Sequence, residues 1–433
     1  MSKLKNTLVI ILLFFNISTS IVWGQSVSDK VNFLLQNTDF QELNRLYPQI
    51  EDSITDDFGK YVIKGALLNS MNQYYDAFKC YDYLINKYST MYDMTDYLNT
   101  ATYCLINMGQ YKDAKQYIER FYYKDTLQQN VKIPFPENFP ILRSYTLAYA
   151  LQDCDSSYLV RKSNKPIIVN MDVNNGLWFV PGYVNGEKES FLMDTGGSGT
   201  LVSEDFARKH DIQLLSDSIQ IEGVNGVEYA QIGFIDSITI GDLSYHNVYV
   251  SVLPALAPDM KEYFGIQIDA ILGTPFLQKV GFVEIYPKKK QIVFPIVKNI
   301  FKPDMKSNIS IWGNIILIEM SVDSIGRQIA YFDSGSLGGV DIAYGLFEKN
   351  QDKFKKYSFE KKKVGVLGIH DKVDTTYVWQ SNKPIPISIG DKNVEIDTAG
   401  SFVNSKFPCV GVSFLNKLDK ITIDLYAMKI TVE

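Results

Sequence analysis

Two stretches of the chain repeat the same order of residue types at nearly the same spacing. In each, an apolar run ends in an aspartate that is followed by a hydroxyl residue and a glycine: Asp194-Thr195-Gly196 and Asp333-Ser334-Gly335. An apolar pair followed by glycine comes 79 residues after Asp194, at Gly273, and 78 residues after Asp333, at Gly411. A match at both ends of such long segments predicts two similarly folded units.

The whole region from Pro166 onward has a β-like sequence. Short runs of Val, Ile, Tyr and Phe alternate with Asn-Gly, Gly-Asp and Asp-Ser turns, which is typical of strands joined by tight turns. Val180–Val184, Asn185-Gly186 and Ser190–Met193 predict a hairpin that leads into the first aspartate. We expect an all-β barrel or sandwich without helical spacers, divided into residues 166–298 (lobe 1) and 299–433 (lobe 2).

Residues 25–125 carry a helical pattern with few Gly and Pro residues. Met71–Ala77 aligns with Met108–Ala114, and apolar residues follow each alanine at helical spacing: Tyr81, Leu84, Ile118 and Phe121. The pattern resembles the tetratricopeptide repeat (TPR), which implies a concave face for a protein partner. The alternative is a generic pair of helical hairpins. Three prolines mark residues 126–165 as a connector with one further helix over Leu142–Leu151.

The first 24 residues have the order of an export signal. Lys3 and Lys5 precede the apolar run Leu8–Phe15, and small or polar residues lead to a cleavage site after Gly24. The sequence therefore predicts a secreted or periplasmic protein, the alternative being an uncleaved membrane anchor.

Composition excludes several other classes of function. The net charge is −6 and no basic stripe is present, which argues against nucleic acid as a partner. The three histidines are far apart and no paired Cys/His spacing occurs, so we expect neither a metal nor a cofactor. The four cysteines match no disulfide framework; Cys80–Cys104 is the one pair worth testing.

Two carboxyl groups in the repeated loops could hydrolyse a peptide bond. Carboxylates about 3 Å apart cannot both ionise, so the pair shares one proton. The ionised member would activate water and the protonated member would polarise the carbonyl group. Glycine permits the sharp turn and the close approach, and the hydroxyl residue can hydrogen-bond to the opposite loop. The candidate site is therefore Asp194 and Asp333 as catalytic residues, supported by Thr195, Gly196, Ser334 and Gly335.

On these motifs, Pro166–Glu433 resembles the aspartic peptidases of the retropepsin and pepsin group. The resemblance implies a bilobal acid-protease fold with both lobes in one chain, and an extended peptide or protein as substrate. It also implies two flap hairpins that cover this substrate, with these tip residues: Gly223, Val224, Asn225, Gly226, Gly368, Ile369 and His370.

The second copy departs from the family pattern more than the first. The family usually has a hydroxyl residue four positions after each aspartate, where lobe 1 has Ser198 and lobe 2 has Leu337. Three positions after, lobe 1 has Gly197, which cannot stabilise an ionised carboxylate, so we expect a mildly acidic to near-neutral optimum. Two alternatives remain open: a non-catalytic binding or scaffold protein with a degenerate lobe 2, and a retropepsin-like homodimer of lobe 1.

Overall fold

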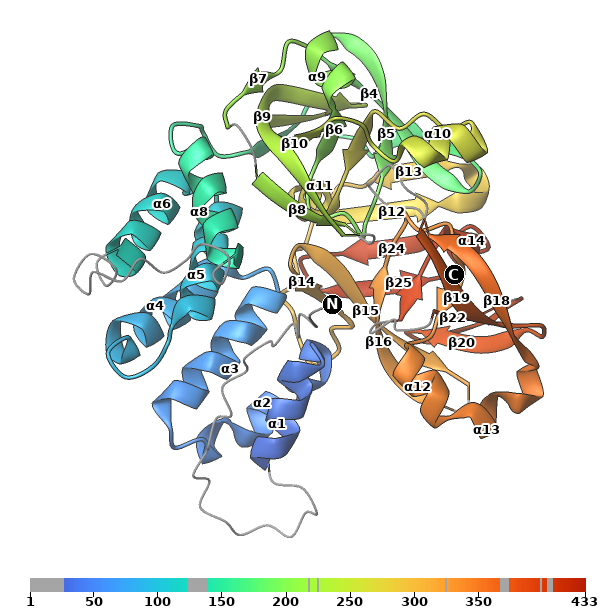
Figure 1. The fold of residues 1–433 in the computed structure, drawn as a ribbon, viewed down its shortest axis with the longest axis horizontal. Coiled ribbons are helices and arrows are strands. Elements are labelled where there is room, and N and C mark those ends of the chain that lie inside the picture. Colours follow the sequence, from blue (N-terminus) through green and yellow to red (C-terminus); the bar gives the residue numbers. More distant parts are fainter. Residues whose placement is uncertain are drawn as a thin grey trace.

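A computed structural model describes residues 27–123, 139–216, 219–223, 226–323, 325–366, 374–397, 399–402 and 408–433. A helical region, residues 27–151, is followed by a large β region (Figure 1). The predicted export signal lies outside the described residues. Within them, no helix combines the length and the hydropathy that crossing a membrane would require.

The helical region is a succession of packed helices. Asp56 caps α3 by accepting hydrogen bonds from two backbone N–H groups. Ala77 and Ala114, the repeated alanines, are fully buried in α4 and α6. Their small side chains let neighbouring helices approach closely, as the repeat predicted; membership of the TPR family stays a prediction. The helices are α1 (Val27–Gln36), α2 (Phe40–Ile50), α3 (Asp57–Ser70), α4 (Tyr74–Tyr88), α5 (Thr95–Asn107), α6 (Tyr111–Ile118) and α8 (Phe139–Leu151).

The first of three sheets carries the first Asp-Thr-Gly motif. Its strands are β1 (Tyr158–Arg161), β3 (Asp172–Asn174), β4 (Leu177–Val184), β5 (Glu187–Met193), β6 (Leu201–Ser203), β7 (Gln213–Leu214), β8 (Ile219–Gly223), β9 (Gly226–Ile240), β10 (Leu243–Leu253) and β11 (Ala270–Leu272). The predicted hairpin is β4–β5, with the turn at Asn185-Gly186. Strand β1 lies within the predicted connector and pairs with β10, so the first sheet begins before residue 166.

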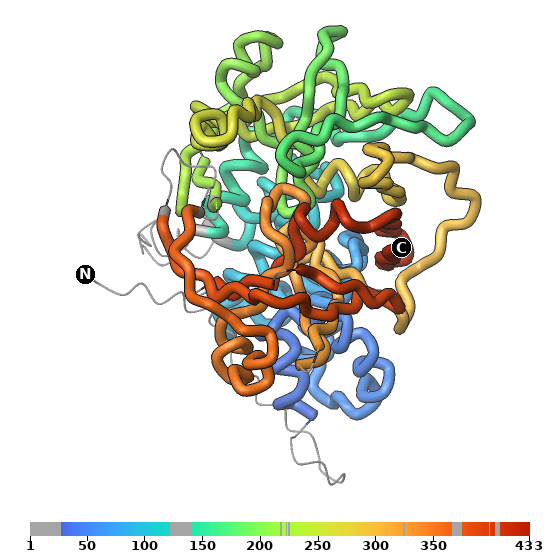
Figure 2. The backbone as a smooth tube through the Cα atoms, turned by 90° about the vertical axis from the view of Figure 1, so that its right-hand side faces the viewer, coloured from blue at the N-terminus to red at the C-terminus, as the bar shows by residue number. Residues whose placement is uncertain are grey.

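The second sheet carries the Asp-Ser-Gly motif. Its strands are β14 (Ile309–Trp312), β15 (Ile315–Val322), β16 (Gly326–Phe332), β17 (Val340–Asp341), β18 (Phe359–Val366), β19 (Asp374–Ser381), β20 (Ile385–Ile389), β21 (Lys392–Ile396), β22 (Ala399–Phe402) and β23 (Cys409–Val410). In Figure 2 the first sheet lies above the second.

A third sheet joins the two halves of the β region, and we call it the shared sheet. It has the order β2 (Ile167–Asn170), β13 (Gln291–Phe294), β12 (Phe282–Tyr286), β24 (Ile421–Asp424) and β25 (Lys429–Val432). Strand β12 pairs with β24 across the boundary, with Ile285 opposite Ile421. The inward side chains of β12 and β24 are buried. The two halves therefore share a hydrogen-bonded ladder and a core.

The expectation that the β region has no helical spacers is wrong. Helix α9 (Glu204–Lys209) directly follows β6 and is capped by Ser203. The unexpected helices are α10 (Pro258–Phe264), α11 (Thr274–Val280), α12 (Tyr344–Lys349), α13 (Gln351–Phe354) and α14 (Val412–Leu415). Helix α11 has a proline in its first turn, where no backbone N–H is needed, and ends at Gly281 with φ 76°. Its apolar residues Phe276 and Leu277 are buried.

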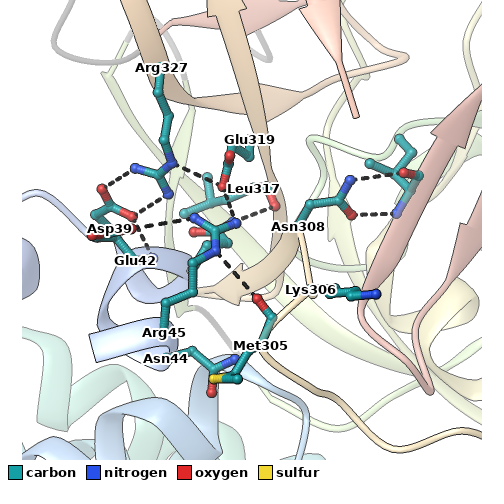
Figure 3. A network of polar contacts seen from close by, with 12 residues as sticks. Asp39, Glu42, Asn44, Arg45, Met305, Lys306, Asn308, Leu317, Glu319 and Arg327 are labelled. Carbon is teal, nitrogen blue, oxygen red and sulfur yellow. Dashed lines mark hydrogen bonds and ion pairs between the residues drawn. The ribbon is translucent and has the colours of Figure 1, made fainter. Parts of the chain in front are cut away.

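The helical region is joined to the second sheet by a polar network (Figure 3). Arg327 of β16 donates to both carboxylate oxygens of Asp39, at 2.5 and 2.7 Å, while Asp39 also caps α2. Glu319 of β15 pairs with Arg327 and with Arg45 of α2, at 3.0 and 2.6 Å. Both arginine side chains are largely buried. These pairs are shielded from solvent and hold α2 against β15 and β16.

Two further contacts extend this attachment to both halves of the β region. Asn107, at the end of α5, exchanges side-chain hydrogen bonds with Asn314 in the β14–β15 turn, at 3.2 and 3.3 Å. Tyr74 of α4 accepts a hydrogen bond of 2.8 Å from Gln278 of α11. Part of the helical surface is therefore covered by the β region of the same chain.

Candidate active site

The two aspartates follow equivalent strands in the two sheets. Asp194 comes directly after β5 and Asp333 directly after β16. Strand β11 pairs parallel with β5, and β23 pairs parallel with β16. The backbone N–H of Asp194 donates to Leu272 and that of Asp333 donates to Val410, both at 3.0 Å. The duplication found in the sequence is thus a duplication of local structure.

Gly273 and Gly411 have the same role in the two copies. A Cβ atom on Gly273 would lie 2.2 Å from the carbonyl oxygen of Gly199, and one on Gly411 would lie 2.4 Å from that of Gly338. No side chain fits at either position. Each apolar-apolar-Gly segment therefore passes directly beside one aspartate loop.

The hydroxyl groups that follow the aspartates bridge the two loops. The Thr195 Oγ1 donates to the carbonyl of Phe332 at 2.7 Å, and the Ser334 Oγ donates to the carbonyl of Met193 at 2.6 Å. Each hydroxyl also accepts the backbone N–H of the other residue, at 2.9 and 3.0 Å. Both side chains are fully buried. The four bonds fix the two loops relative to one another.

The two carboxyl groups meet where the loops cross. The Asp194 and Asp333 side chains are hydrogen bonded to each other and are partly exposed. A Cβ atom on Gly196 would lie 2.5 Å from the Asp333 carboxyl carbon, and one on Gly335 would lie 2.6 Å from that of Asp194. The loop glycines therefore create the space in which the carboxyl groups approach.

Backbone donors hold each carboxyl group in place. Asp194 accepts the N–H of Gly196 at 2.9 Å, while Asp333 accepts the N–H groups of Gly335 and Ser336 at 2.9 and 3.1 Å. Burial, and then the charge of Asp333, raise the pKa of Asp194 well above its usual value. Burial also raises the pKa of Asp333, against the stabilising effect of its donors. Asp333 accepts one backbone N–H more than Asp194 does, which stabilises its ionised form, so Asp194 is the better candidate to hold the shared proton.

The departures from the family pattern have different structural outcomes. Ser198 is exposed, and Leu337 uses its carbonyl to accept a 2.6 Å hydrogen bond from Ser413. Ser336 interacts with Cys409 rather than supplying a hydroxyl bond to a catalytic carboxylate. Thr274 was missed from the sequence: its buried hydroxyl donates to the carbonyl of Thr195 at 2.8 Å. Its place directly after Ile-Leu-Gly could have indicated this role.

The predicted flap residues are only partly described. Strands β8 and β9 form a hairpin in which Gly223 lies opposite Gly226; Val224 and Asn225, between them, lie outside the described residues. Strands β18 and β19 form a second hairpin. Gly368, Ile369 and His370 fall between these strands and also lie outside the described residues.

Other predicted groups can be placed directly. All four cysteines are free thiols, so Cys80 and Cys104 form no disulfide. Glu187, Glu189 and His210 are close enough to one another to hold a metal ion. Lys209, however, pairs with both carboxylates, and the His210 Nε2 lies 2.8 Å from Glu189. A cation from the chain itself therefore already neutralises this cluster.

The family model described as aspartyl protease matches residues 180–276, which include the Asp-Thr-Gly loop and β11. The chain thus carries an aspartyl protease domain over these residues. No curated protein is significantly similar to the chain.

Two solved structures are similar to parts of this chain. A retropepsin-like aspartic protease from Rickettsia conorii is 20% identical, with TM-score 0.22, over 32% of this chain and 91% of that chain. Conglutin gamma, a basic 7S globulin from lupine seeds, is 9% identical, with TM-score 0.41, over 63% of this chain and 95% of that chain. At these TM-scores neither structure bears on the function.

Proposed function

We propose that the chain is an exported aspartic endopeptidase whose catalytic groups are Asp194 and Asp333. The observation that carries this proposal is the pair of carboxyl groups, hydrogen bonded to one another and fixed by the hydroxyls of Thr195 and Ser334. The match to the aspartyl protease family over residues 180–276 supports the same reaction.

The difference between the two carboxyl groups assigns their roles. Asp333, ionised, takes a proton from water as the water oxygen bonds to the peptide carbonyl carbon, and Asp194 donates its proton to the carbonyl oxygen. The resulting tetrahedral intermediate has two hydroxyl groups on the former carbonyl carbon. Asp333 then protonates the leaving nitrogen as the C–N bond breaks, and Asp194 takes a proton from one of these hydroxyl groups. The dyad ends with one shared proton, as it began.

The bound peptide would be extended and covered by the β8–β9 and β18–β19 hairpins. An extended strand can hydrogen-bond to such hairpins through its backbone, which makes recognition of the backbone independent of sequence. The helical region would fix the position of both halves of the β region through its contacts with Arg327 and Gln278. The part of its surface that the β region does not cover is the candidate binding site for a protein partner.

Single substitutions test the catalytic proposal. Asp194→Asn and Asp333→Asn should each abolish cleavage of an unstructured protein over pH 3–8, and a pepstatin-type inhibitor should block the wild-type activity. Full activity of Asp333→Asn would exclude the single-chain dyad and favour a homodimer of lobe 1. Peptide binding by the wild-type protein without inhibitable cleavage would favour a scaffold. The shared sheet supports the single-chain arrangement, since β12 and β24 pair within one molecule.

The export part of the proposal has its own test. Sequencing the N-terminus of the protein recovered from outside the cytoplasm should give Gln25 as the first residue. An intact N-terminus in a membrane fraction would favour the uncleaved anchor.

A further inference from the structure

A row of side chains crosses the second sheet beside Asp333. By strand register, it links Tyr331 of β16, Cys409 of β23, Asp341 of β17, Gly400 of β22 and Gln380 of β19. Residues opposite each other on paired strands share one face of a sheet. The charge of Asp333 acts on both Asp341 and Cys409, so the row lies close to the Asp333 carboxyl group.

The face of the second sheet that carries this row is partly exposed to solvent, whereas the opposite face is buried. All five members of the row are partly exposed. The next row across the same strands is buried throughout and consists of Phe332, Val410, Val340 and Ala399. A side chain of a peptide bound at Asp333 can therefore reach the first row but not the second.

The equivalent row in the first sheet carries no charge. It runs through Leu192, Ile271, Leu201, Ser251 and Ile232, with Leu201 at the place of Asp341. Leu192, Ile271 and Ile232 are buried. The two sheets thus present different surfaces beside the two aspartates, and Asp341 is the charged difference.

The Asp341 carboxyl group lies close against the Gly400 backbone and has no counter-charge among the described residues. Among the described residues, no hydrogen-bond donor or basic side chain contacts it. A Cβ atom on Gly400 would lie 2.4 Å from its Oδ1, and one on Gly338 would lie 3.5 Å from its Oδ2. Burial, and then the charge of Asp333, raise the pKa of Asp341 to about 7. An ionised carboxylate in this position requires a cation from elsewhere.

Building on the proposed peptidase function, we propose that Asp341 is a specificity-determining residue that pairs with a lysine or arginine side chain of the bound peptide. The ammonium or guanidinium group would supply the missing counter-charge through a charge-assisted hydrogen bond. Tyr331 and Cys409, its neutral neighbours in the row, would contact the apolar stem of that side chain.

The experiment compares pairs of peptides in which one member has lysine at a given position and the other has norleucine there. A separate pair is made for each position around the cleaved bond. At one position the wild-type protein should cleave the lysine peptide with a kcat/KM about tenfold above its norleucine partner, as expected for one partly shielded charge pair. Asp341→Asn, and Asp341→Leu, which copies Leu201, should bring this ratio to about one.

The matched control is Glu360→Gln. Glu360 is an exposed acid opposite Gln380, at the far end of the same ladder. This variant should keep the lysine preference. Loss of the preference in Glu360→Gln would show a general attraction between charges, and a preference that survives in Asp341→Asn would overturn the inference.

Failure of the inference and failure of the peptidase proposal give different results. Cleavage of both peptides at equal rates by the wild-type protein would overturn the role of Asp341 alone. If no peptide is cleaved, the fluorescence anisotropy of the same peptides, labelled with a fluorophore, measures their binding to the protein instead. Weaker binding of the lysine peptide alone to Asp341→Asn would then support the inference, and equal binding would overturn it.

Discussion

Thr195 and Ser334 each donate a hydroxyl hydrogen bond to the carbonyl group that immediately precedes the other residue's aspartate. Each also accepts the other's backbone N–H. The same four bonds that place the carboxyl groups therefore join the two halves of the β region at their point of contact. The geometry of the proposed catalytic pair and the stability of the fold therefore depend on the same atoms.

Replacing Thr195 with valine should lower stability and activity together. The substitution leaves the buried N–H of Ser334 and the carbonyl of Phe332 without partners, which costs about 2–4 kcal/mol for two such groups. Urea unfolding measures this loss. Thr100→Val, which removes an exposed hydroxyl bond within α5, should change the free energy of unfolding by less than about 0.5 kcal/mol. Equal losses in the two variants would contradict the bridging role.

Replacing Gly196 or Gly335 with alanine should abolish cleavage while leaving a folded protein. The added methyl group would overlap the carboxyl group of the opposite aspartate. The kcat should fall by at least about a hundredfold, as when reacting groups are displaced by an ångström. Gly345→Ala is the control, since a Cβ atom there meets nothing within 4 Å. Activity close to wild type in Gly196→Ala would place the reacting carboxyl groups elsewhere.

The pH dependence of kcat/KM should be bell-shaped with its maximum at mildly acidic pH. The acid and alkaline limbs report the two macroscopic proton losses of the Asp194–Asp333 pair. Both pKa values are raised by burial, so both limbs should lie above the usual range for aspartate. A peptide substrate without titratable groups ensures that the pH dependence reports ionisation of the protein alone. Activity confined to well below pH 4 would contradict the prediction.

Replacing Arg327 with methionine should loosen the helical region from the second sheet. It leaves the carboxylates of Asp39 and Glu319 largely buried without their shared cation, a loss of about 3 kcal/mol. Thermal unfolding and protease sensitivity of α2 measure the effect. Lys355→Met removes a fully exposed pair with Asp352 and should leave the Tm almost unchanged. Similar costs for both would show that the network adds no stability.

Asp341→Asn should also change the pH dependence of stability. In the folded protein the pKa of Asp341 is raised to about 7. The contribution of protonated Asp341 to stability is therefore complete below the pKa that Asp341 has in the unfolded chain, and it is lost as the pH rises toward 7. The variant should therefore gain stability relative to the wild type between pH 5 and pH 8, by an amount on the order of 1–2 kcal/mol. Parallel Tm curves for the two proteins would exclude an unpaired carboxylate at Asp341.

The sequence predicted the site more completely than its surroundings. Asp194 and Asp333 could be recognised from the sequence because each is followed, at nearly the same distance along the chain, by an apolar pair and a glycine, Gly273 or Gly411. Asp341 follows two glycines and a valine, a context without periodicity, and its position beside Asp333 depends on strand pairing.

Long-range pairing explains the other omissions. Asp39 meets Arg327 across 288 residues, and β12 meets β24 across the boundary between the two halves. Local patterns contain no information on such partners. Helix α11 was missed for a different reason, since its starting proline was present but the apolar run matched a strand equally well.

The shared sheet also determines when the catalytic site can form during synthesis. Strand β24, which pairs with β12, and β23, which supports the Asp333 loop, are made more than a hundred residues after the Asp194 loop. A ribosome-bound chain that ends before residue 409 has the strands that support the Asp194 loop, but it lacks β23 beside the Asp333 loop and β24 and β25 of the shared sheet. The two aspartate loops can therefore reach their final geometry only after β23, β24 and β25 have been made.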